Sequence, residues 1–225
     1  MQVQKTIEVV FENEDLLAFY KPKDLPTVPL KGKEGDTLLS LAGEKYPEIL
    51  SPYGKNPWEG TILHRLDTPT SGLVLAPRNK ETYNYLINLQ DRDEIVKTYI
   101  AQVSDEKKPL EGFEPFPYSI EKGRVEIISS FRSYGPKGAS VRPLFKKRKG
   151  DERLYKTEVE FLHDNTLRCT ITRGFRHQIR CHLSWTGMPI LGDDRYGGKE
   201  NDFLMLEAVS VSFPYKGKNM EISIN

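Results

Sequence analysis

An aspartate just before a buried strand is the side chain of this sequence best placed to do chemistry. Asp67 lies two residues after Arg65 and shortly before the apolar run 72–76. A carboxylate held at the edge of a strand can attack carbon as a nucleophile or abstract a proton. The same carboxylate can instead accept hydrogen bonds from turn amides such as those of Thr68 and Ser71. Position alone leaves both interpretations open.

A second group of candidate residues falls on a predicted helix late in the chain. Apolar residues four apart predict an amphipathic helix from Phe175 to Trp185. Arg176 and Arg180 have the same spacing and are expected to form a basic stripe, with His177 alongside. Two arginines on one helical face suit a phosphate or a carboxylate, although ion pairs with surface acids would use them equally well.

Other familiar catalytic arrangements are absent or disfavoured. The sequence has no glycine-rich phosphate loop, HExxH helix or GxSxG elbow. A triad of Ser71, His64 and Asp67 is disfavoured because all three lie in one short segment, with no separate element to hold the base. A zinc site is also disfavoured, since its candidate ligands would lie on a strand and on different sides of one helix. Those ligands are Cys169, His177, Cys181 and His182.

The composition indicates a globular protein and excludes a membrane-embedded or disordered one. The 225 residues are 37% hydrophobic and 10% aromatic, and the mean hydropathy is −0.55. No apolar run approaches the roughly 20 residues that span a bilayer. No leader-like apolar segment follows the first residues, so we expect a cytoplasmic protein. Two cysteines are too few for a disulfide scaffold.

Charge is balanced overall but unevenly distributed. Thirty-three basic and 32 acidic residues give a net charge of +1, which neither demands nor excludes a polyanionic partner. Basic residues nevertheless predominate between positions 121 and 156. This stretch contains four consecutive basic residues, Lys146, Lys147, Arg148 and Lys149. They form either a phosphate-binding patch or a solvated loop.

The order of apolar patterns predicts an α+β fold. Alternation predicts an opening hairpin within residues 7–20, and the prolines of 21–29 predict a stiff extended loop. Asp36 is expected to cap a short helix that ends before Pro47, and Asn79 to cap a second helix. Many strands without repeated strand–helix units favour a mixed, largely antiparallel sheet flanked by helices and loops. Further strands are predicted at 72–76, 94–103, 124–131, 156–162, 166–172, 203–213 and 219–224.

Four short motifs occur in order along the chain. They are Lys21-Pro22-x-x-Leu25-Pro26-Thr27-Val28-Pro29; His64-Arg65-Leu66-Asp67-x-x-Thr70-Ser71-Gly72-Leu73-Val74-Leu75; Lys97-Thr98-Tyr99-Ile100-Ala101; and His177-Gln178-Ile179-Arg180-x-His182-Leu183 with Gly187-x-Pro189-Ile190-x-Gly192-Asp193-x-x-Tyr196-Gly197. Together, over about residues 16–213, they resemble the signatures of the RluA-type pseudouridine synthases, which isomerise uridine in ribosomal or transfer RNA. Four motifs in register make this resemblance specific.

The resemblance implies a pseudouridine synthase fold. Many members of that family have a small N-terminal RNA-binding domain, but the predicted hairpin opens this sequence, so we expect one catalytic domain over residues 1–225 and no separate N-terminal RNA-binding domain. It implies that Asp67 is the catalytic carboxylate, that Tyr99 stacks on the uracil, and that Arg180 lies against Asp67 and keeps it ionised. The Tyr99 hydroxyl is a candidate for removing the C5 proton. Arg65 is expected to hold the flipped nucleotide or fill the space it leaves. The other expected RNA-binding residues are His64, Arg176, His177 and Lys146 to Lys149.

The expected partner is a stem-loop of rRNA or tRNA with a flipped-out uridine, bound by a monomer. No metal or organic cofactor is expected, because the reaction is an isomerisation without redox chemistry or hydrolysis. Two other functions stay open. One is a non-catalytic RNA-binding protein, acting as a chaperone or assembly factor. The other is a carboxylate-dependent nucleoside or glycoside hydrolase, which would need a second acid that the sequence near Asp67 does not offer.

Overall fold

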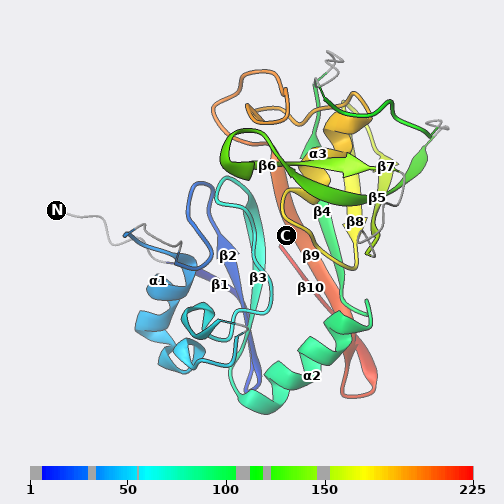
Figure 1. Ribbon diagram of the computed structural model, residues 1–225. Helices are drawn as coiled ribbons and strands as arrows, with labels where there is room; N and C mark the ends of the chain where they lie inside the picture. Colours follow the sequence, from blue (N-terminus) through cyan, green and yellow to red (C-terminus); the bar gives the residue numbers. More distant parts are fainter. Residues whose placement is uncertain are drawn as a thin grey trace. The chain divides into compact units, whose positions relative to one another are not determined.

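The computed structural model describes residues 7–29, 34–54, 56–104, 112–118, 123–145 and 153–224 (Figure 1). The chain divides into two compact units. The first contains Met1–Ile95 and Ala208–Asn225, and the second contains Val96–Glu207. Strands outnumber helices in both, and the strand pairs of each unit described below are antiparallel. The prediction of an α+β fold with a largely antiparallel sheet is confirmed.

The described residues of the first unit form several strands and two α-helices. Its strands follow the order β1-β2-β3-β9, with β10 paired to β9. Lys21, the last residue of β2, lies opposite Gly72 of β3. Gly72 has a φ of +117°, and a Cβ there would lie 2.2 Å from the Ala208 carbonyl oxygen, so only glycine fits. The elements are β1 (Glu8–Glu12), β2 (Leu16–Lys21), α1 (Leu38–Lys45), β3 (Ser71–Pro77), α2 (Lys80–Asp91), β9 (Leu206–Tyr215) and β10 (Lys218–Ser223), with short 3₁₀ turns at Pro47–Leu50 and Pro57–Glu59.

The core of the first unit joins the strands to α2. All seven positions of β3 are buried, as expected for a strand covered on both faces. Side chains of β2, β3, β9, β10 and α2 form one apolar cluster with the segment before Asp67. Its members include Leu16, Leu63, Leu73, Leu75, Leu86, Leu89, Phe213 and Tyr215.

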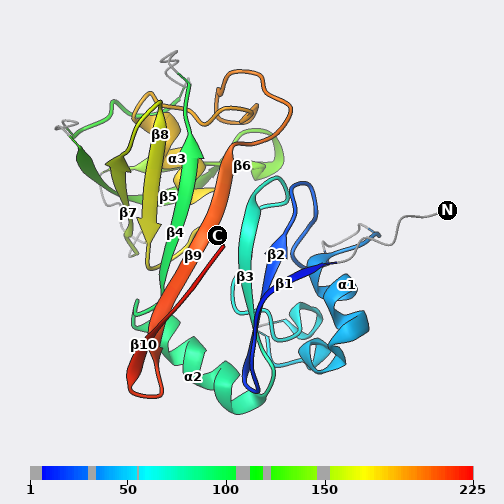
Figure 2. The same ribbon diagram turned by 180° about the vertical axis from the view of Figure 1, so that it is seen from behind.

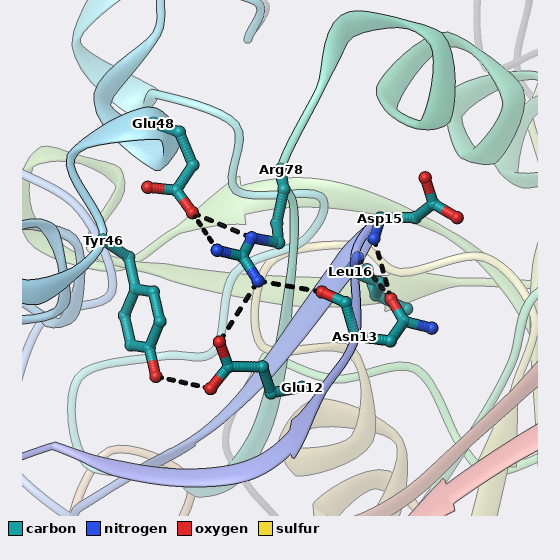
Figure 3. A network of polar contacts seen from close by, with 7 residues as sticks. All are labelled: Glu12, Asn13, Asp15, Leu16, Tyr46, Glu48 and Arg78. Atoms are coloured by element: carbon teal, nitrogen blue, oxygen red, sulfur yellow. Dashed lines mark hydrogen bonds and ion pairs between the residues drawn. The ribbon is translucent and has the colours of Figure 1, made fainter.

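A network of hydrogen bonds and ion pairs connects the end of β1, the residue after β3 and the segment after α1 (Figure 3). Arg78, just after β3, donates from Nε to Glu48 at 2.8 Å and from Nη1 to Glu12 at 3.1 Å. The same Nη1 donates to the Asn13 carbonyl at 2.9 Å, and the Tyr46 hydroxyl donates to Glu12 at 2.7 Å. One guanidinium therefore ties the opening hairpin to the segment that follows α1.

The cap of α1 differs from the prediction. Thr37, not Asp36, is the N-cap residue, with extended φ and ψ of −131° and 162°. Its side chain accepts a hydrogen bond from the Ser40 amide at 3.0 Å, and its own amide donates to Ser40 Oγ at 2.9 Å. The prediction was wrong by one position because a cap is fixed by this reciprocal pairing three residues apart. The cap predicted at Asn79 is confirmed, since its side chain accepts from the Thr82 amide.

The corrected cap can be tested by substitution. We expect Thr37→Ala to lower the free energy of unfolding by about 1 kcal/mol, because the Ser40 amide loses its acceptor. Asp36→Ala is the matched control and should cost less than about 0.5 kcal/mol, as ordinary surface substitutions do. Urea denaturation measures both. A larger loss in Asp36→Ala than in Thr37→Ala would restore the cap to Asp36.

The second unit is a twisted sheet in the order β4-β8-β7-β5-β6 (Figure 2). Helix α3 packs against β6 and β7. Phe131, Val141, Cys181 and Tyr196 form a buried cluster between α3 and the strands. The sequence did not predict β6, a five-residue edge strand whose alternation is interrupted by Pro143. The elements are β4 (Val96–Gln102), β5 (Arg124–Tyr134), β6 (Ser140–Leu144), β7 (Tyr155–Phe161), β8 (Thr166–Ile171) and α3 (Gln178–Trp185), with a 3₁₀ turn at Pro136–Gly138.

Candidate active site

Asp67 lies in a tight turn that leads directly into β3. The Thr70 amide donates to the Asp67 carbonyl oxygen at 3.0 Å and closes the turn. The Asp67 side chain is half-buried. Its negative charge favours the protonated form of the buried Lys21, so the two side chains are electrostatic neighbours. A short turn on a fully buried strand presents this carboxylate from a rigid support.

The two residues near Asp67 that were predicted to bind RNA differ in exposure. The Arg65 side chain is 60% exposed, and its Nη1 lies 2.8 Å from the Glu59 carboxylate. His64 is half-buried, and its Nε2 accepts a hydrogen bond from the Leu75 amide of β3 at 3.4 Å. His64 therefore contributes to fixing this segment against β3, while the Arg65 guanidinium is accessible to a ligand.

Tyr99 lies on β4, in the second unit. Its side chain is buried, and it pairs with Cys169 of β8 in the strand register. Lys97, Tyr99 and Ala101 share the buried face, as the alternating pattern predicted. Asp67 belongs to the first unit and Tyr99 to the second, so a shared active site of Asp67 and Tyr99 stays a prediction.

Arg180 is buried in α3 and bound by Asp193. Its Nε and Nη2 donate to the two carboxylate oxygens of Asp193, each at 2.8 Å, in a bidentate pair. The side chains are 5% and 0% exposed. The guanidinium also lies over the Tyr196 ring, 5.4 Å from its centroid. The predicted pairing of Arg180 with Asp67 joins residues of different units and stays a prediction.

The predicted basic stripe of Arg176 and Arg180 is wrong. Helix α3 begins at Gln178, three residues later than predicted, because His177 has a left-handed backbone with φ of 57°. Arg176 therefore precedes the helix and does not share a face with Arg180. It is exposed, and its Nη2 donates to the carbonyl oxygens of Gly138 and Ser140 at 2.7 and 3.1 Å.

His177 and Tyr196 form a second contact beside the arginine pair. His177 Nδ1 lies 3.0 Å from the Tyr196 hydroxyl, which also accepts from the Val141 amide at 2.9 Å. Burial raises the pKa of Tyr196, so the phenol keeps its proton and can donate it to a neutral His177. A non-glycine residue in the left-handed region is costly and is often found at functional sites. His177 is half-buried.

The remaining candidates divide into two groups. The basic run Lys146 to Lys149 lies outside the described residues. Of the four residues considered as zinc ligands, Cys169, Cys181 and His182 are fully buried, whereas His177 is half-buried. Burial raises the pKa of Cys169 to about 12 and lowers the pKa of His182 to about 3. His182 lies between the hydroxyls of Ser129 and Thr157, at 2.9 and 2.8 Å. Over the part of the chain that the structure describes, no three His, Cys, Asp or Glu side chains are grouped to bind a metal.

Comparison with known proteins decides the family. A model of the family described as RNA pseudouridylate synthase matches residues 15–185. The chain belongs to this family. The resemblance to RluA-type pseudouridine synthases is thereby confirmed. The matched segment contains Asp67, Tyr99 and Arg180.

Two bacterial members of the RNA pseudouridylate synthase family are similar to this chain. The ribosomal large subunit pseudouridine synthase C of Rickettsia felis is 28% identical over 226 residues, which cover 96% of this chain and 66% of the relative. Synthase D of Yersinia pestis is 28% identical over 193 residues, covering 86% and 53%. The chain thus spans between about half and two thirds of their lengths.

A solved structure shares the fold of this family member. The human protein "RNA Pseudouridylate Synthase Domain Containing 1" matches with a TM-score of 0.72 at 18% sequence identity, covering all of this chain and 85% of that one.

No helix among the described residues is long and apolar enough to cross a membrane.

Sequence reasoning missed the role of Asp193 and Tyr196. Both belong to the last family motif, which by itself assigns them no function. Their spacing from Arg180 follows no helical or strand period, since they lie in a turn-rich segment after α3. The available signal was chemical: an arginine predicted on an amphipathic helix near the core requires a carboxylate partner once it is buried.

Proposed function

We propose that the protein is an RNA pseudouridine synthase with Asp67 as its catalytic carboxylate. The observation that carries the proposal is the family match over residues 15–185, which includes the complete Asp67 motif. The rigid turn that presents Asp67 supports the same role. Because the relatives' names specify the large ribosomal subunit, rRNA of that subunit is the first substrate to test, and tRNA is the second.

The reaction breaks the bond between ribose C1′ and uracil N1, turns the base while it is held, and joins C1′ to C5. The C5 hydrogen leaves as a proton and N1 gains one, so that no atom is gained or lost overall. A carboxylate near the sugar can attack C1′, add to the base, or abstract a ribose proton, and Asp67 suits each of these roles. In this proposal Arg180 lies beside Asp67 and fixes the direction of its carboxylate.

Tyr99 supplies the flat surface on which the uracil stacks. A target uridine must leave its helical stack, which costs a few kcal/mol that contacts to the flipped base must offset. Stacking on an aromatic ring contributes about 1–3 kcal/mol per base. Arg65, exposed beside the Asp67 turn, then holds the flipped nucleotide or occupies the vacated space.

Phosphate contacts complete the proposed RNA interface. They would come from the exposed Arg176, from His64 and His177, and from the run Lys146 to Lys149. We propose a monomer in the cytoplasm that recognises a stem-loop by its local shape, with residues 1–225 acting as one catalytic domain.

Release of tritium from RNA labelled at uracil C5 tests the proposal. The substrate is total RNA from cells that lack the gene, separated into rRNA and tRNA fractions. We expect the purified wild-type protein to release tritium from one fraction, and carbodiimide-dependent reverse-transcription stops to map the site. Binding of RNA without release from any fraction would instead support the non-catalytic RNA-binding function.

Tyr99→Phe separates the two roles proposed for the tyrosine. The substitution keeps the stacking ring and removes the hydroxyl. If the hydroxyl takes the C5 proton, kcat should fall by about 10²-fold or more while RNA affinity is unchanged. Single-turnover tritium release and filter binding measure the two quantities. Wild-type kcat in Tyr99→Phe would eliminate the proton-abstraction role and leave stacking intact.

A further inference from the structure

Lys21 is a buried lysine that makes three hydrogen bonds, one of them to the Asp67 turn. Its side chain is fully buried at the end of β2. Nζ donates to the carbonyl oxygens of Pro22 at 2.9 Å, Leu25 at 2.7 Å and Thr68 at 3.0 Å. Thr68 directly follows Asp67 in the sequence. One ammonium thus links the proline-rich loop to the far side of the catalytic turn.

Thr27 makes the corresponding contact on the near side. Its hydroxyl is buried, donates to the Leu66 carbonyl at 3.0 Å and accepts from the Leu66 amide at 3.1 Å. Leu66 directly precedes Asp67. The loop that carries Thr27 is itself fixed, because the first two amides of α1, those of Leu38 and Leu39, donate to the carbonyls of Pro26 and Thr27 at 2.8 and 3.1 Å.

We propose that Lys21 and Thr27 are positioning residues for the Asp67 carboxylate, which they hold by fixing the backbone of the residues on either side of it. This proposal deepens the proposed function and rests on it. Neither side chain is assigned contact with substrate. We call the two residues and their contacts to Leu66 and Thr68 the Asp67 brace.

The chemistry of Lys21 fits a brace. Three carbonyl acceptors match the three N–H donors of an ammonium, so a buried charge is fully satisfied. Burial lowers the pKa of Lys21 to about 8, and the negative charges of Asp24 and Asp67 oppose that change. At neutral pH the Lys21 amine is therefore mostly in its ammonium form. As the pH rises through 8, the neutral amine keeps two donors and one carbonyl loses its hydrogen bond.

The consequence for catalysis follows from geometry. A nucleophile or base displaced by about 1 Å can lose roughly 10²-fold in rate, although binding of the rest of the substrate is unaffected. Loss of the brace should accordingly lower kcat and leave KM nearly unchanged. A residue that served only stability would change the fraction of folded protein, not the rate of the folded fraction.

The Thr27 pair of variants tests the brace with little change in volume. Thr27→Val removes the hydroxyl from both Leu66 contacts, whereas Thr27→Ser keeps it. We expect Thr27→Val to lower kcat for tritium release by about 10-fold or more, with KM and RNA affinity within about threefold. Thr27→Ser should recover kcat to within about threefold of wild type. Wild-type kcat in Thr27→Val, or no recovery in Thr27→Ser, would overturn the proposal.

Lys21→Met tests the other side of the brace, with Lys23→Met, two residues further along the chain, as the matched control. We expect a loss of kcat in Lys21→Met only. If Lys21→Met fails to fold, the Thr27 variants still decide the question.

Amide hydrogen exchange tests the brace without relying on activity. In Thr27→Val the Leu66 amide, and the Thr70 amide that closes the Asp67 turn, should exchange at least about 10-fold faster than in wild type. Unchanged exchange at both amides would contradict the brace. If the wild-type protein itself is inactive, the proposed function fails. Failure of the brace can therefore be distinguished from failure of the proposed function.

Discussion

Asp67→Asn is expected to lower tritium release from C5-labelled RNA by at least about 10³-fold, because the amide is neither a nucleophile nor a base. The substitution keeps the size and the turn, so RNA affinity should stay within about threefold. The closing hydrogen bond from the Thr70 amide reaches the Asp67 backbone, which the change does not touch. Single-turnover tritium release and filter binding measure the two effects on the same preparations.

Asp24→Asn is the matched control for that experiment. Asp24 is also a negative neighbour of Lys21, but it is exposed and has a left-handed backbone with φ of 61°, which asparagine tolerates. We expect its turnover to equal that of wild type. Turnover retained in Asp67→Asn would remove the carboxylate from the reaction, and an equal loss in both variants would assign the effect to the charge around Lys21.

Arg180→Met is expected to give the largest loss of stability. The substitution leaves the Asp193 carboxylate buried without the guanidinium that now binds it at 2.8 Å through two nitrogens. Removing one partner of a buried ion pair typically costs about 3–5 kcal/mol of unfolding free energy. Urea denaturation measures it through the fluorescence of Trp185, which lies on the same helix, in a Trp58→Phe background that removes the other tryptophan.

Two further variants make this result specific. Arg180→Met combined with Asp193→Leu removes both charges, so the double variant should recover most of the lost stability. Arg124→Met breaks an ion pair with Glu160 in which the arginine is 81% exposed, and it should cost less than about 1 kcal/mol. Strictly additive losses in the double variant would contradict a buried, mutually dependent pair.

The sequence predicted most of the strands because each has a local signal. Alternation along 94–103 correctly placed Lys97, Tyr99 and Ala101 on one buried face of β4. The opening hairpin and the Asn79 cap followed from equally local patterns. Where the local signal was weak, the prediction failed: β6 is short and contains a proline, and the start of α3 depends on a left-handed His177 that no periodicity reveals.

The partners of the site residues were beyond local reasoning. Lys21 and Thr68 are 47 positions apart, and only the folded chain brings the ammonium to that carbonyl. The pattern predicts Arg180 on a basic stripe with Arg176, because helical spacing does not distinguish an arginine that binds a ligand from one neutralised by Asp193. The family motifs identified the important positions, whereas the contacts that hold them required the three-dimensional structure.

The most direct test of the account is the stoichiometry of the reaction. RNA labelled with tritium at uracil C5 and with ¹⁴C in the ring is incubated with the wild-type protein, digested to nucleosides and separated by chromatography. If the protein is an Asp67-dependent isomerase, one pseudouridine should form for each tritium released, and no free uracil should appear. With Asp67→Asn, neither pseudouridine nor released tritium should appear. Free uracil without pseudouridine would show that the glycosidic bond is hydrolysed and would contradict the proposed isomerisation.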